Sequence, residues 1–343
     1  LDEGYGIQLS VNSIKLLNKI GFDKMKDSQK FYPKKLDFYL NNKLQKFCEL
    51  EISKFNSNDC KYTTLKRSTL INFLKSNLEE HIKVKKRISK IEQEKQQIKL
   101  YFENNEINAC DYLIISDGVF SKSKNLIFNS KIKPKYNGTL AIRGTIDKSK
   151  LNIDNKNISL FLNSDFHHVI YPVNSNGDLN FTAIMKYKLS ESEKNNFELF
   201  NDNSFIKRVL DKFPKAVKFL PDNLNNLKIF PVFVSDDFYN AKNEKIHLIG
   251  DAFFAFPPSF AQGATQSIEG AYELFESIEN NTQKNFFKKR VSTAKMINNR
   301  SKFNQFAFHL SSPLTTFLRN IFLKKLVKNR KFLEFYLGKI YNN

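Results

Sequence analysis

Residues 245–278 read KIHLIGDAFFAFPPSFAQGATQSIEGAYELFESI and predict a strand, a loop and a helix in that order. The apolar run 246–249 stops at Gly250 and Asp251, as a buried strand does when it carries a carboxylate to its C-terminal end. Open α/β sheets bind their ligands at that end of their strands. We therefore expect a ligand site beside Asp251, whose carboxylate can accept hydrogen bonds from sugar or polyol hydroxyls.

A helix is expected after the pair Pro257-Pro258, because proline cannot continue a strand. Apolar residues then recur at helical spacing and predict a single apolar face, made of Ala264, Ile268, Ala271, Phe275 and Ile278. The free N–H groups around Gln262, Gly263 and Ala264, at the positive end of the helix dipole, favour a ligand that carries or develops negative charge. On these residues alone, a strand, loop and helix with small residues for tight packing is an equally good interpretation.

The segment 250–271, GDAFFAFPPSFAQGATQSIEGA, resembles the GDA–x–H–x–x–x–P–x–x–GQG–x–N–x–A–x–E–D–A segment of the FAD-dependent aromatic hydroxylases. These are single-component flavin monooxygenases similar to p-hydroxybenzoate, salicylate and ubiquinone-pathway hydroxylases. The resemblance implies that Gly250 and Asp251 hold the ribityl chain of FAD. It also implies that the turn 262–264 stabilises the negative charge of the reduced flavin, and that Pro257 and Pro258 face the substrate. Four residues depart from the family pattern: Phe254, Ala261, Thr265 and Gly270.

A second acidic turn lies earlier in the chain, within ACDYLIISDGVFSKSK. Residues 112–115 read as a buried strand, and Asp117-Gly118 follow its C-terminal end. The segment resembles the A–D–x–x–x–x–A–D–G–x–x–S–x–x–R motif of the same hydroxylases, where Asp-Gly is associated with FAD and with the nicotinamide cofactor. Ser121 matches that motif, and Lys124 replaces its Arg. A lone Asp-Gly predicts only a turn, but both acidic turns in family order are far more specific.

Three further residues match family positions. Arg67 begins a predicted helix in an R–x–x–L–x–x–x–L pattern, and the resemblance implies that it reaches the flavin. Arg143 in AIRG and Tyr171 in HVIYPV match positions on the sheet that faces flavin and substrate. The alternatives are a surface Arg67, an Arg143 paired with an acid, and a Tyr171 packed within the sheet. No catalytic side chain stands out, so Tyr171 and Pro258 are the candidates to face the substrate.

The pattern of elements and the resemblance together predict an α/β (α+β) fold. We expect a Rossmann-like FAD-binding domain formed by residues 1–134 and 235–280. An antiparallel-sheet substrate domain, residues 135–234, is inserted between its two parts, and basic helices follow over residues 281–343. Residues 4–21 read as a turn followed by a helix, and no G–x–G–x–x–G unit is found. We therefore expect an N-terminally truncated FAD-binding domain.

Composition limits the function classes. The formal net charge is +20, and residues 281–343 hold 14 Lys or Arg residues against one acid, Glu334. Three cysteines without a CxxC pair suggest neither a disulfide framework nor a zinc site, and they fit a reducing cytoplasm. The adjacent His167 and His168 point to opposite faces if they lie on a strand, so we expect no metal site.

The segment 310–331 combines an apolar stripe at helical spacing with interspersed basic residues. Such a helix can bind an anionic membrane surface, which would make the protein cytoplasmic but peripheral to the membrane. Coverage of the protein's own core is the more common role of such a stripe. We expect no nucleic-acid partner.

The resemblance implies an oxidoreductase, an FAD-dependent monooxygenase that uses NADH or NADPH and O₂ to insert one oxygen atom into a ring. The substrate would be a small aromatic or quinone-like molecule. A flavoprotein of the same fold that does not hydroxylate, such as a reductase or halogenase, is one alternative, although the chain has no Trp for the WxWxIP motif of halogenases. A basic module that binds RNA or membrane is the other.

Overall fold

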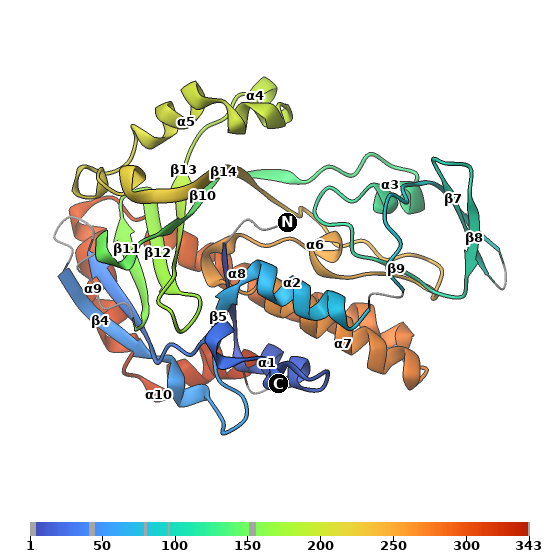
Figure 1. Ribbon diagram of the computed structural model, residues 1–343, viewed down its shortest axis with the longest axis horizontal. Coiled ribbons are helices and arrows are strands. Elements are labelled where there is room, and N and C mark those ends of the chain that lie inside the picture. The colour runs from blue at the N-terminus through green and yellow to red at the C-terminus, as the bar shows by residue number, and fades with distance from the viewer. Residues whose placement is uncertain (1–4, 41–44, 79–80, 95–96, 151–155, 342–343) are drawn as a thin grey trace. The chain divides into compact units, whose positions relative to one another are not determined.

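The computed structural model describes residues 5–40, 45–78, 81–94, 97–150 and 156–341 (Figure 1). The chain forms two compact units, each built from separate stretches of sequence. Unit 1 contains Leu1–Phe73, Gly138–Val232 and Lys302–Asn343. Unit 2 contains Leu74–Asn137 and Phe233–Ser301.

Unit 1 is built on a seven-stranded sheet of order β14-β10-β13-β12-β11-β3-β4. All neighbours are antiparallel where their register is given, except the parallel pair of β11 with β3. The strands are β3 (Lys35–Leu40), β4 (Gln45–Glu51), β10 (Lys135–Ile146), β11 (Ile158–Asn163), β12 (Phe166–Pro172), β13 (Leu179–Lys186) and β14 (Leu224–Val234). The inserted sheet is thus present, and β3 and β4 join it from earlier in the sequence. Strand β14 was not predicted.

The central strands β11, β12 and β13 are buried along nearly their whole length. Both faces of the sheet are therefore covered, and the strands bury polar residues such as Ser159, His168 and Asn180 along with their apolar ones. A small sheet of order β1-β5-β2, formed by β1 (Gly6–Leu9), β5 (Thr63–Lys66) and β2 (Lys30–Phe31), contacts β12 and β13. The hydroxyl of Thr64 in β5 donates to the carbonyl of Pro172 at 2.6 Å.

The prediction of a turn at residues 4–9 is wrong, because Gly6–Leu9 form strand β1 ahead of helix α1 (Val11–Asn18). The reason is tertiary. A Cβ at Gly6 would lie 2.7–2.8 Å from atoms of Asn180, Val173 and Tyr171. Gly6 is therefore needed for close approach of β1 to the large sheet, which local sequence patterns do not reveal.

Unit 2 holds the parallel pair β9 (Leu113–Ile115) and β15 (Ile246–Leu248), and an antiparallel sheet β6-β7-β8. The latter contains β6 (Ile88–Gln93), β7 (Ile98–Phe102) and β8 (Ile107–Cys110), with β7 in the middle. Helices α3 (Lys122–Phe128), α6 (Gly250–Phe253) and α7 (Gly263–Glu279) complete the unit, together with the first part of α8 (Gln283–Phe308). One apolar cluster joins strands β7, β9 and β15 to α6 and α8: Ile98, Leu113, Ile115, Ile246, Leu248, Ala252, Phe253, Phe254 and Ala294.

Helix α7 forms where it was predicted, but its apolar face is not the face that it buries. Phe275 is 57% exposed and Ala271 is exposed, whereas the buried residues are Thr265, Gln266, Glu269, Gly270 and Leu274. The cause is Arg290 of α8, which is 4% exposed and hydrogen-bonds to Gln266. A buried guanidinium requires polar partners, so the polar side of α7 turns inward.

The C-terminal residues are helical, as predicted, and belong to unit 1. They form α9 (Pro313–Leu326), α10 (Arg330–Leu333), a π-helical turn (Glu334–Gly338) and α11 (Lys339–Tyr341). Arg319 of α9 is buried and donates to the carbonyl of Ala307, so this side of α9 faces the protein. The apolar stripe faces away, with Leu314 68%, Phe317 61% and Phe322 59% exposed. The described helices include none that is long and apolar enough to cross a membrane.

His168 of β12 is a buried imidazole in the core of unit 1. It stacks on Phe161 with ring centroids 4.4 Å apart. Burial lowers the pKa of His168 to about 3. In the unfolded chain the same group titrates near a pKa of about 6.5. Below that pH the unfolded chain takes up a proton that the folded chain does not, so acid destabilises the fold.

We predict that His168→Phe reduces this acid sensitivity. Between pH 7 and pH 5 the wild type should lose about 2 kcal/mol of unfolding free energy through His168, at about 1.4 kcal/mol per pH unit below pH 6.5. The variant keeps an aromatic ring against Phe161 and has no group to protonate. Denaturant unfolding at the two pH values measures the difference. An equal loss in wild type and variant would show that folded His168 accepts the proton.

Candidate functional site

Two acidic turns leave the same edge of the short parallel sheet in unit 2. Leu248 of β15 pairs with Ile115 of β9, and the Ile249 N–H donates to the Ile115 carbonyl at 3.0 Å. Asp117 lies two residues beyond Ile115, and Asp251 lies two residues beyond Ile249. Because the carboxyl ends of parallel strands meet at one edge, the sheet brings these two carboxylates into one region.

Glycines shape both turns. Gly118 has φ +84° and Gly250 has φ +58°, a left-handed conformation that residues with a side chain rarely adopt. A Cβ on Gly250 would lie 3.2 Å from the Ser267 hydroxyl, so its absence lets the Asp251 turn lie against the first turns of α7. A Cβ on Gly118 would meet no described atom within 4 Å. The Asp117 turn therefore has open space beside Gly118.

The carboxylate of Asp117 also has a local structural task. Its Oδ2 accepts the backbone N–H of Ser123 at 3.0 Å, and the Ser121 hydroxyl accepts that of Lys124 at 3.0 Å. Both contacts cap the beginning of α3. The Asp-Gly motif predicts a cofactor contact for Asp117 but not this capping role, which uses one of its two oxygens.

The first turn of α7 offers N–H groups beside the acidic turns. Its N-cap residue, Gln262, makes no side-chain cap hydrogen bond, and the first turn holds no acidic residue. Gly263 is exposed, and a Cβ there would meet no described atom within 4 Å. Together with the helix dipole, this arrangement suits the electron-rich edge of a ligand. Gln262 itself is buried, at 3% exposure.

The loop before α7 contains a strained residue. Ala261 has φ +51° and ψ +33°, the left-handed region, at the position where the family pattern has Gly. It closes the 3₁₀ turn Pro258–Phe260, and its N–H donates to the Pro258 carbonyl at 3.0 Å. Pro257 is buried and Pro258 is half-buried. The Pro258 carbonyl, expected to face a substrate, therefore accepts a hydrogen bond from its own turn.

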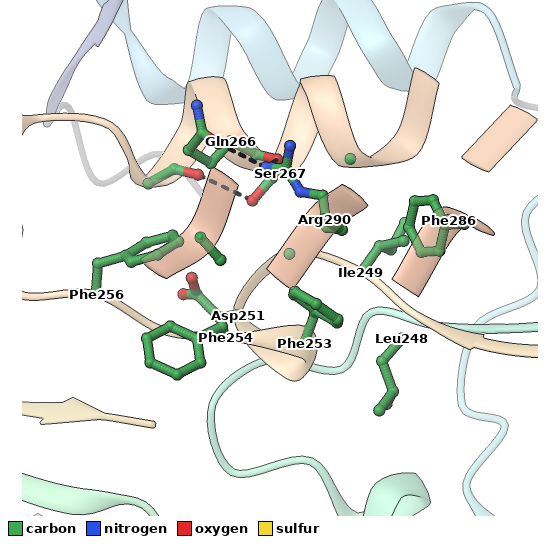
Figure 2. Close-up of a pocket in the computed structure, with 14 residues that line it drawn as sticks. Leu248, Ile249, Asp251, Phe253, Phe254, Phe256, Gln266, Ser267, Phe286 and Arg290 are labelled. Carbon is green, nitrogen blue, oxygen red and sulfur yellow. Dashed lines mark hydrogen bonds between the residues drawn. The ribbon is translucent and has the colours of Figure 1, made fainter. Parts of the chain in front are cut away.

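Figure 2 shows a cavity lined by residues of α6, α7 and α8. Asp251 and Phe254 line it from α6 and the residue after it, and Gln266 lines it from α7. Arg290 donates to the Gln266 carbonyl at 2.7 Å and to its Oε1 at 2.6 Å, and it lies 3.4 Å from Glu273. The guanidinium thus ties α8 to the first half of α7.

Arg143 and Tyr171 lie on one face of the large sheet in unit 1. Arg143 pairs with Thr182 and Tyr171 pairs with Asn180, and the Asn180 amide donates to the Thr182 hydroxyl at 3.2 Å. Cross-strand partners share a face, and so do residues two apart on one strand. The structure therefore brings these two candidate residues together, as the sheet motif implied.

Tyr171 is 4% exposed and its ring touches Gly6 of β1. Burial raises the pKa of Tyr171, while the nearby Arg143 and a hydrogen bond with Gln8 lower it in part. Arg143 is half-buried, with Cζ 5.9 Å from the Phe230 ring centroid. These contacts fit a Tyr171 that packs within the sheet as well as they fit a Tyr171 that faces the substrate.

Arg67 is the first residue of α2 (Arg67–Ser76), as predicted, and its side chain is exposed. Its N–H donates to the Tyr5 carbonyl at 2.7 Å. Arg67, Arg143 and Tyr171 belong to unit 1, and the other candidate residues belong to unit 2.

The two adjacent histidines of β12 diverge, as their strand position requires. His167 Nδ1 lies 2.8 Å from His309 Nε2, whereas His168 stacks on Phe161. Within the described ranges, no three His, Cys, Asp or Glu side chains are grouped to hold a metal ion.

Two buried cations, Lys124 and Arg290, were not identified as functional from the sequence. Lys124 appeared only as a departure from the second motif. Arg290 is one of the 14 basic residues of 281–343, and its sequence context does not separate it from exposed ones. Only its contacts with α7 distinguish it.

No protein-family model matches the chain. Among curated proteins, the salicylate hydroxylase of Pseudomonas putida is 23% identical over 241 residues, which cover 62% of this chain and 53% of that protein. The 6-hydroxynicotinate 3-monooxygenase of Bordetella bronchiseptica is 21% identical over 289 residues, covering 80% of this chain and 73% of that protein. The chain is similar in sequence to FAD-dependent aromatic hydroxylases. It spans about half the length of the salicylate hydroxylase it matches.

The structural comparison shows that the chain has the fold of these hydroxylases. The crystal structure of Klebsiella pneumoniae HpxO complexed with FAD and uric acid matches with a TM-score of 0.83 at 14% identity. That match covers 98% of this chain and 87% of the HpxO chain. The fold predicted from the two acidic turns is confirmed.

We predict that Ala261→Gly stabilises the protein. A left-handed conformation costs a residue with a side chain about 1 kcal/mol more than it costs Gly. The free energy of unfolding should therefore rise by up to about 1 kcal/mol. Ala271→Gly, at an exposed helical position of α7, is the matched control and should lower it by about 1 kcal/mol. A fall in both variants would mean that Ala261 is unstrained.

Proposed function

We propose that this chain belongs to an FAD-dependent monooxygenase that uses NADH or NADPH and O₂ to oxygenate the ring of a small aromatic or quinone-like substrate. The observation that carries the proposal is the convergence of the Asp117 and Asp251 turns beside the uncapped first turn of α7. The relatives' activities support it, since salicylate hydroxylase and 6-hydroxynicotinate 3-monooxygenase are named for ring hydroxylation.

The residues present fit a bound flavin. The open space at Gly118 and Gly263, where a Cβ would meet no described atom, leaves room for a flat ligand close to the backbone. Asp251 would accept hydrogen bonds from the ribityl hydroxyls. The N–H groups of Gly263 and Ala264 would stabilise negative charge on the pyrimidine edge, with Gln262 setting the turn. When bound, FAD supplies the electron transfer and the activation of O₂.

The remaining candidates take the roles that the resemblance implies for each of them. Arg67, exposed at the start of α2, would pair with an anionic part of the cofactor. We assign Arg143 and Tyr171 on the inserted sheet, and the Pro257-Pro258 turn, to the substrate side. In this assignment residues 1–134 and 235–280 hold FAD, and residues 135–234 hold the substrate. The protein's task is to bind, orient and exclude water.

We predict that Asp251→Ala in the full-length protein abolishes copurification of yellow FAD, because the ribityl chain loses its charged acceptor. Asp111→Ala is the matched control. Asp111 is an exposed carboxylate just before the amino end of β9, away from the edge where both turns meet. It should keep stoichiometric FAD. The measurement is the visible absorbance of purified protein against its concentration.

Stoichiometric FAD in the Asp251→Ala variant would contradict the assignment. If the purified wild type carries no chromophore and binds RNA in a gel-shift assay, the result would favour the basic binding module instead. Substrate-stimulated NAD(P)H oxidation with phenolic acids, and detection of the hydroxylated product, separates a monooxygenase from a reductase of the same fold.

We further propose that the protein is cytoplasmic and contacts the membrane peripherally through residues 310–331. The supporting observation is the exposed apolar stripe of α9, which the protein's own core does not cover: Leu314, Phe317, Leu318, Ile321 and Phe322. Exposed Lys324, Lys325 and Lys328 follow at its C-terminal end, and residues 302–333 contain no acid. Two copies of this basic surface would repel each other, so an anionic lipid surface is the better partner.

We predict that Phe317→Ser/Phe322→Ser lowers binding to vesicles that mix phosphatidylcholine with phosphatidylglycerol, because the apolar contact is lost. Burying two Phe side chains contributes about 3 kcal/mol or more, so binding should fall by at least a hundredfold. Thr315→Ser/Thr316→Ser on the same helix is the control. Cosedimentation measures the bound fraction. Equal binding of wild type to neutral vesicles, or none to either kind, would contradict an anionic lipid surface.

A further inference from the structure

Lys124 is a buried lysine that connects the two acidic turns. It lies in α3, directly after the Asp117 turn, and is 4% exposed. Its Nζ donates to the carbonyl of Ala252 at 3.3 Å. Ala252 is the residue after Asp251. The same Nζ lies 5.4 Å from the ring centroid of Tyr239.

Burying this ammonium group is unfavourable unless nearby groups compensate its charge. Burial lowers the pKa of Lys124, and the nearby Asp117 raises it in part. A lysine is almost never buried without a partner, because taking the charge out of water is costly. Here the compensation is one carbonyl, one aromatic face and one neighbouring carboxylate. Two of the three, the Ala252 carbonyl and the Asp117 carboxylate, belong to the acidic turns of the candidate cofactor site.

The geometry also explains how Lys124 could act. Pairing between β9 and β15 ends with the contact of Ile249 with Ile115. Beyond that point, the hydrogen bond from Lys124 to Ala252 joins the Asp117 turn to the Asp251 turn. Helix α3 is itself fixed to the Asp117 turn by the caps from Asp117 and Ser121. The ammonium therefore completes a closed loop of contacts around the edge of the sheet.

We propose that Lys124 is a positioning residue that holds the Asp251 turn in register with the Asp117 turn and so sets the affinity for FAD. This inference rests on the proposed flavin-binding function. It assigns Lys124 no contact with the flavin or substrate. Its effect passes through the backbone of Ala252 to the neighbouring Asp251.

The test is FAD binding to apoprotein, followed by flavin fluorescence, with a matched set of variants. Lys124→Met keeps the length and apolar stem but removes the donor, and should weaken FAD binding by at least about tenfold, the usual effect of losing a charged hydrogen bond. Lys124→Arg keeps a charged donor and should restore binding. Lys122→Met, at an exposed position of the same helix, should bind FAD as the wild type does.

A double-mutant cycle distinguishes positioning from general destabilisation. If Lys124 acts through the Asp251 turn, Lys124→Met should weaken binding further by much less in an Asp251→Asn background, which keeps a neutral acceptor and measurable binding, than in the wild type. Equal effects in both backgrounds would overturn the inference. Circular dichroism checks that each variant is folded, and Lys124→Gln, which keeps a neutral donor, replaces Lys124→Met if that variant is not.

The outcomes separate the two proposals. If the wild type binds FAD and the Lys124→Met variant binds it with the same affinity, the positioning role is refuted and the flavin site stands. Wild type that binds no FAD refutes the flavin site itself.

Discussion

The parallel pairing of β9 with β15 is the constraint on which the candidate site depends. Each strand is only three residues long, and the apolar cluster containing Leu113, Ile115, Ile246 and Leu248 holds the pair in place. Parallel strands end at a common edge, so two acidic turns that are far apart in sequence meet there. The first turn of α7 follows the Asp251 turn and adds N–H groups to the same region.

Buried charges maintain this edge. Arg290 ties α8 to α7, and Lys124 ties α3 to α6. Each charge lies in a buried environment and is compensated by carbonyl, carboxylate or aromatic partners rather than by water. Such contacts are directional, whereas apolar packing is not. Polar contacts therefore suit a site in which backbone N–H groups and carboxylates must keep fixed positions.

The large sheet of unit 1 depends on packing more than on buried charges. Its central strands are buried on both faces, so most inward side chains pack against other elements. Tyr171 is enclosed by Gly6 and linked to Gln8, while Arg143 retains partial exposure. The same unit leaves the stripe of α9 exposed. A contiguous exposed apolar surface generally marks an interaction site.

The sequence by itself determined the strand, loop and helix around Asp251, the second acidic turn and most strands of the inserted sheet. These features arise from local patterns: apolar runs, turn residues and helical spacing. Tertiary structure decided the rest. Only packing reveals that Gly6 lies in a strand, that α7 turns its polar side inward toward Arg290, and that Lys124 reaches Ala252. Each of these depends on a partner distant in sequence, and no local periodicity records which partner a side chain will meet.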